Sequence, residues 1–110
     1  MSAHADIGSL RRRLTVEEPV ETIDALGGAS VVHVVTGDTW AAVEPVRMAE
    51  AVDAAGRSGA VVTHRIVLRA DLTVAPGWRL SGGGRRYRVL AVSDPDGRGA
   101  FLRCLAEEES

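Results

Sequence analysis

The clearest secondary-structure signal lies in residues 60–70, AVVTHRIVLRA. Apolar residues recur at every second position, and arginines occupy two of the positions between them. A two-residue period predicts a strand with one buried and one wet face, which is typical of an antiparallel sheet. The predicted inner face comprises Val62, His64, Ile66 and Leu68, and the predicted outer face comprises Thr63, Arg65, Val67 and Arg69.

Toward the C-terminus, turn signals alternate with short apolar runs. The turns contain proline, which presets φ, or glycine, which permits positive φ. We expect Tyr87, Val89 and Ala91 to share the buried face of one run, with Arg86 and Arg88 opposite. The predicted strands are residues 78–80, 85–92 and 99–106, preceded by turns at 76–77, 82–84 and 94–97.

Toward the N-terminus, the pattern predicts shorter strands. Residues 14–17 alternate as a short strand, and Pro19 and Gly27-Gly28 suggest a polar connection after it. Residues 29–35 and 39–44 are two further apolar runs on either side of Gly37-Asp38. We therefore expect a hairpin that turns at Gly37-Asp38.

Residues 47–57 have a different hydrophobic periodicity. Met48, Ala51, Val52 and Ala55 recur at three- and four-residue spacing, which predicts a short amphipathic helix or helical loop. The stretch is only weakly apolar, so we expect residues 47–59 to become ordered against a partner.

These elements predict a mainly β fold. Six or seven short strands, with turns about every ten residues, would form a small antiparallel β-barrel or sandwich with one short helix or helical loop. The 110 residues suit one domain, 1–110, with a flexible arm at 1–9 and a solvated acidic tail at 107–110.

Composition excludes several classes of protein. The net charge is −2, and all 13 basic residues are arginine, which disfavours a dedicated nucleic-acid binder. No basic segment followed by an apolar one opens the chain, so we expect no signal peptide, and no apolar run is long enough for a membrane span. A single cysteine suits assembly in a reducing bacterial cytoplasm.

The sequence gives little support for a catalytic, cofactor-binding or metal-binding site. The three histidines and Cys104 show no metal-ligand spacing, so we expect Cys104 to fill the core and His64 to bond to the backbone. Gly82-Gly83-Gly84 lacks the lysine and the following helix of a phosphate loop. We therefore predict no catalytic residue, no cofactor and no metal.

Two basic clusters leave alternatives open. Arg11-Arg12-Arg13 and Arg85-Arg86 could bind nucleic acid, but the four aromatic residues are few for base stacking. Ion pairs across a subunit interface, or a solvated face, suit them better. The remaining rivals are a nucleic-acid-binding small barrel and a small ligand-binding or enzymatic barrel.

The order of several motifs resembles that of phage head–tail joining, or head-closure, proteins. Residues 7–16 (IGSLRRRLTV) resemble the opening of that family, and 39–45 (TWAAVEP) resemble its strand with tryptophan and proline. Residues 63–69 (THRIVLR), 85–92 (RRYRVLAV) and 102–104 (LRC) are similar to its later strands. The arginine-only usage also resembles the connectors of gene transfer agent particles.

This resemblance implies a non-enzymatic subunit that works as a homo-oligomeric ring of six or twelve copies. Head-to-tail contacts use two different patches on each subunit and form a ring only if the rotation between copies closes it. The ring would lie in the particle neck, below a portal or adaptor protein and above a tail terminator or tail protein. Packaged DNA would be retained and would pass through the ring without sequence-specific binding, and no membrane would be involved. The candidate assembly-interface residues are Leu10, Arg11, Arg12, Arg13, Arg47, Met48, Glu50, Val52, Arg57, Arg85 and Arg86.

Overall fold

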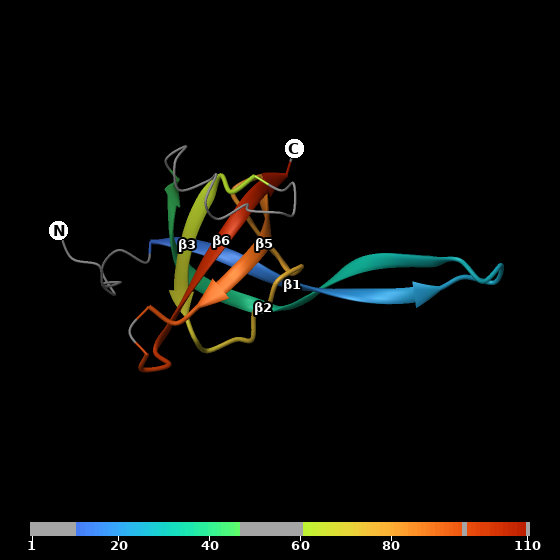
Figure 1. Cartoon of the computed structure of the whole chain (residues 1–110), viewed down its shortest axis with the longest axis horizontal. Coiled ribbons are helices and arrows are strands. Elements are labelled where there is room, and N and C mark those ends of the chain that lie inside the picture. The colour runs from blue at the N-terminus through green and yellow to red at the C-terminus, as the bar shows by residue number, and fades with distance from the viewer. Residues whose placement is uncertain (1–10, 47–60, 96, 110) are drawn as a thin grey trace.

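The computed structural model describes residues 11–46, 61–95 and 97–109, and in these ranges six antiparallel strands close into a barrel (Figure 1). Neighbouring strands follow the order β1-β2-β3-β6-β5-β4, and β4 pairs with β1 to complete the circle. This confirms the predicted mainly β, antiparallel barrel. The strands are β1 (Arg12–Ile23), β2 (Ala29–Pro45), β3 (His64–Arg69), β4 (Arg79–Gly82), β5 (Arg85–Ser93) and β6 (Phe101–Glu109).

The barrel interior is filled by side chains from all six strands. Ile66 and Leu68 of β3 are fully buried, as their alternation predicts, and Arg65 and Val67 lie on the outer face. Burial of such side chains is the dominant favourable term in folding. The core cluster consists of Leu14, Val16, Ala41, Ile66, Leu68, Val74, Leu80, Tyr87, Val89, Cys104 and Ala106.

Strand β5 departs from strict alternation. Tyr87 and Val89 are buried, but the register against β6 shifts between Val89 and Ala91. Such a bulge inserts one extra residue and moves the following side chains to the opposite face. Ala91 is therefore exposed, contrary to prediction, and Val92 packs against the core in its place.

The predicted hairpin at Gly37-Asp38 is wrong, because residues 29–45 form the single strand β2. Gly37 does not adopt a positive φ; it pairs with Val16, and the next residue of β1, Glu17, pairs with Val35, so Thr36 is an extra residue in β2. A Cβ at this position would lie 3.2 Å from Leu72 Cδ1, so the glycine allows Leu72 to pack closely and does not form a turn.

The chain turns instead at residues 24–28, in the stretch predicted to be a polar connection. Strand β1 continues through Pro19 to Ile23 and pairs with β2 over its whole length. Proline is tolerated there because β1 pairs with β4 only at residues 15–17 and is an edge strand beyond them. The β1–β2 hairpin therefore extends out of the barrel, as Figure 1 shows, and the molecule measures 54 × 30 × 28 Å.

The acidic residues near the C-terminus belong to the sheet. Residues 107–109 continue β6 and are half-buried, so the predicted solvated acidic tail at 107–110 is corrected as far as Glu109. Pairing with β5 and nearby arginines explains why these carboxylates join the sheet.

The helix or helical loop predicted at 47–57 and the flexible arm predicted at 1–9 lie outside the described residues. The described ranges contain no helix of the length and apolarity that a membrane span requires.

Candidate assembly surfaces

The β1–β2 hairpin ends in a tight turn held by one carboxylate. Asp24 Oδ1 accepts hydrogen bonds from the backbone N–H groups of Leu26, at 2.9 Å, and Gly28, at 2.8 Å. Gly27 adopts a φ of 83°, a conformation that glycine allows at little steric cost. An aspartate that bonds to the backbone ahead of it is a recurrent turn device. The sequence predicted only a polar connection here, although Asp24 followed by Gly27-Gly28 is a turn signal.

Beyond the barrel, the hairpin is a two-stranded ribbon. We call residues 18–35 the arm, because β1 past Glu17 and β2 before Thr36 pair with no third strand. The hydroxyls of Thr22 and Ser30 lie 2.9 Å apart across the ribbon. An isolated two-stranded ribbon is marginally stable in water, so a surface of this kind is typical of an element that contacts a partner.

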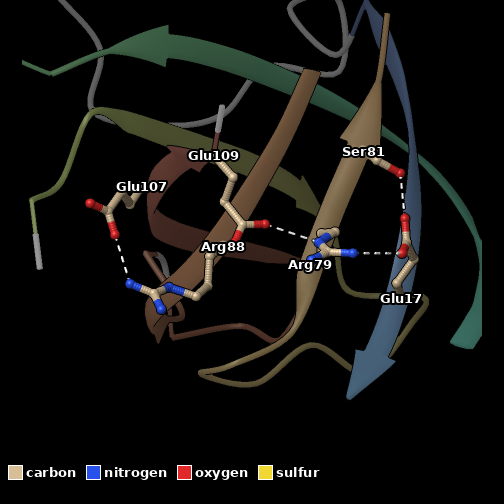
Figure 2. Close-up of polar contacts among 6 residues, drawn as sticks. All are labelled: Glu17, Arg79, Ser81, Arg88, Glu107 and Glu109. Carbon is tan, nitrogen blue, oxygen red and sulfur yellow. Dashed lines mark hydrogen bonds and ion pairs between the residues drawn. The ribbon is translucent and has the colours of Figure 1, made fainter. Parts of the chain in front are cut away.

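A network of half-buried ions joins β1, β4 and β6 on the outside of the barrel, and Figure 2 shows Arg79 between two glutamates. Arg79 Nε donates to Glu109 Oε1 at 3.0 Å, and Arg79 Nη1 lies 3.7 Å from Glu17 Oε1. Ser81 Oγ donates to Glu17 Oε2 at 2.6 Å. Charge-assisted hydrogen bonds are stronger than neutral ones, so this network stabilises the closure of the barrel between β1 and β4.

The predicted basic clusters lie at one end of the barrel. Arg13 and Gly82 come close enough that a Cβ on Gly82 would lie 2.7 Å from the Arg13 carbonyl oxygen. Gly82 pairs with Arg85 across the β4–β5 turn. The structure therefore brings Arg11-Arg12-Arg13 near Arg85-Arg86, two clusters that are far apart in the sequence.

Several of these arginines face carboxylates of the same chain. Arg13 Nε lies 3.4 Å from Asp38 Oδ2, and its guanidinium lies 5.6 Å from the centre of the Trp40 ring. Arg85 Nη1 lies 3.8 Å from Glu108 Oε1. Pairing of this kind lowers the positive charge available to a phosphate backbone. Leu10, Arg47, Met48, Glu50, Val52 and Arg57, the other predicted interface residues, lie outside the described ranges.

Cys104 and His64, the residues with potentially reactive side chains, pack against other side chains of the barrel. Burial raises the pKa of the Cys104 thiol to about 12, so the thiolate needed for nucleophilic attack is scarce at neutral pH. The His64 ring makes an edge contact with Tyr87, with ring centres 5.1 Å apart, and its Nδ1 lies 3.0 Å from Thr63 Oγ1, a side-chain contact where a backbone one was expected. Among the described residues, no three potential ligands gather into a metal site.

Comparisons with known proteins place the chain among particle components. The family model described as "Phage head completion protein" matches residues 5–109. A chain in the virion of a native gene transfer agent particle is 32% identical, with a TM-score of 0.67, and the match covers 91% of this chain and 96% of that one. Protein SF1141 of Shigella flexneri 2a is 27% identical, with a TM-score of 0.70 and coverage of 96% and 98%. No curated protein sequence gave a significant match.

Proposed function

The chain belongs to the phage head completion protein family, and from that premise we propose that it is a non-catalytic subunit that closes the joint between the head and the tail of a phage-like particle. The subunits would form a ring of six or twelve copies in the neck, after synthesis in the bacterial cytoplasm. A portal or adaptor protein would lie above the ring and a tail terminator or tail protein below it, with packaged DNA retained inside the head.

The observation that carries this proposal is the extent of the match. The family model spans residues 5–109, and the likeness to the virion chain of the gene transfer agent spans nine tenths of both chains. The whole domain, and not one motif, therefore resembles particle components. Function resides in surfaces and sites and not in a fold alone. The proposal therefore also needs support from the surface of this chain.

The described surface suits protein contacts. Arg13, Arg65, Arg79, Arg85 and Arg88 each lie within 4 Å of a carboxylate, whereas a phosphate-binding groove needs positive charge that is not neutralised by the protein itself. The barrel interior is occupied by core side chains. Binding partners through loops, arm and outer faces is therefore the activity that these features favour. Arg11, Arg12, Arg86 and residues 47–59 are further candidate contacts.

Deleting the gene in cells that produce the particle tests the proposal. We expect heads that package DNA but lose it and carry no tails, because the closing subunit is missing, and we expect a plasmid copy to restore complete particles. Electron microscopy and nuclease protection of the packaged DNA measure both effects. Complete, tailed and nuclease-resistant particles made without the protein would contradict the proposed function.

A further inference from the structure

The arm, residues 18–35, carries most of the exposed large hydrophobic residues of the described ranges. Nine large hydrophobic residues are exposed in the described ranges, and seven of them belong to the arm, with exposed fractions from 38% to 96%. They are divided between the two faces of the ribbon, and a concentration of exposed apolar side chains in one element is typical of a surface that binds a partner. The seven residues are Val20, Ile23, Leu26, Val31, Val32, Val34 and Val35.

The charges of the arm are all negative. It contains the carboxylates of Glu18, Glu21 and Asp24 and no arginine. The other described residues contain eleven arginines and eight carboxylates. The arm and the rest of the described chain therefore have opposite net charge, and complementary charge favours contact between an arm and another part of the same protein.

The outer face of β3 and its two neighbours has the matching chemistry. We call this surface the β3 face; Arg69 pairs there with Phe101, Val67 with Arg103, and Arg65 with Leu105. On the side of β2, Ala42 pairs with Val67 and Glu44 with Arg65. The β3 face thus presents half-buried apolar side chains among three arginines. Glu44 lies 3.4 Å from Arg65, and Glu107, next on the same side of β6, pairs with Arg88.

The arm of one molecule is directed away from its own barrel, along the longest dimension, as Figure 1 shows. The barrel that receives it must therefore belong to another molecule. The dimensions agree, because β1 contributes six residues to the arm, 18–23, and β3 has six, which gives a length of about 20 Å for each.

We propose that the arm of each copy lies across the β3 face of the next copy in the ring. This inference rests on the proposed function and names the partner of the arm. The contact uses a different surface on each of the two molecules, so it propagates from copy to copy and closes only if the rotation between copies permits. Valines of the arm would pack on Val67, Phe101 and Leu105, with the carboxylates of the arm near the arginines.

Cross-linking in purified particles tests the contact. Val34 and Val35 are adjacent in β2 and point to opposite faces of the ribbon. One of the two therefore approaches the β3 face, whichever face of the ribbon makes the contact. Particles would be assembled from chains that carry Val67→Cys together with Val34→Cys or Val35→Cys, and treated with a short bis-maleimide. Cys104 is the only native cysteine and is buried, so the wild-type chain provides the unlinked background.

We expect a ladder of dimers, trimers and larger species from one of the two double variants, and no ladder from any single variant. Leu105→Cys is a second acceptor on the β3 face if Val67→Cys reduces folding. Ser81→Cys is the control acceptor and should give no ladder, because it is half-buried like Val67 and lies on β4, three strands from β3 in either direction around the barrel.

Each other outcome overturns the inference. Dimers from a single arm cysteine would show that two arms meet, and links to a different particle protein would give the arm another partner. Complete particles that contain the double variants without any ladder would refute the contact and leave the proposed function standing. Complete particles that lack the protein would refute the proposed function itself.

Discussion

Replacement of Leu80 with alanine is expected to lower the free energy of unfolding by about 3 kcal/mol, within the range of about 2–5 kcal/mol typical of buried leucines. Leu80 is fully buried in the core cluster, on β4, the shortest strand. Its partners across the sheet are Val16 of β1 and Tyr87 of β5, which leave little room for collapse around the missing atoms. Urea denaturation should show a midpoint lower by roughly 1 M or more.

Leu26→Ala is the matched control for this substitution. It removes the same atoms from the tip of the arm, where Leu26 is 96% exposed, so the change in unfolding free energy should stay within about 0.5 kcal/mol. Equal effects of the two substitutions would mean that Leu80 does not lie inside a packed barrel.

Arg79→Ala is expected to cost about 2–3 kcal/mol, because it leaves two half-buried carboxylates without their shared cation. The side chains of Arg79 and Glu17 are 22% and 16% exposed, and Glu109 approaches from the other side. Water therefore screens this network only in part. Urea denaturation at low and high salt measures the effect, which should persist when salt is raised.

Arg88→Ala provides the comparison for Arg79. Arg88 Nη2 lies 2.7 Å from Glu107 Oε1, closer than either contact of Arg79, but the Arg88 side chain is 46% exposed. Arg88 pairs with one carboxylate, Glu107, whereas Arg79 lies between two. Exposed pairs contribute little, so the expected loss is below about 1 kcal/mol. A larger loss for Arg88 than for Arg79 would contradict the role given to the network in closing the barrel.

Much of the barrel follows from local pattern. The alternation in residues 60–70 identified the buried side chains of β3, and the triple glycine predicted the β4–β5 turn, where Gly83 and Gly84 have φ of 61° and 78°. These features are local, because period and turn chemistry are set within a few residues. The resemblance to head–tail joining proteins was likewise confirmed by the family match.

The errors arose where pairing partners override local signals. Gly37-Asp38 looks like a turn, but cross-strand pairing with Thr15 and Val16 keeps β2 continuous through it. Likewise, the bulge at residue 90 depends on the register with β6 and cannot be read from β5 alone. The acidic end of the chain joins the sheet because arginines of other strands face it.

The arm was missed for the same reason. Residues 29–35 were predicted to be one strand of a hairpin that turns at Gly37-Asp38, and Pro19 and Gly27-Gly28 predicted a polar connection before it. The structure joins the two into a ribbon with exposed valines. By contrast, the proximity of Arg13 and Arg85 shows that two of the candidate basic segments do share one end of the barrel.

Electron cryomicroscopy of the joint between head and tail is the most direct test of the ring-subunit assignment. We expect a closed ring of barrels at that joint, each with six strands and with its 18–35 ribbon extended toward a neighbour. A joint built without this chain, or copies found only elsewhere in the particle, would contradict the account.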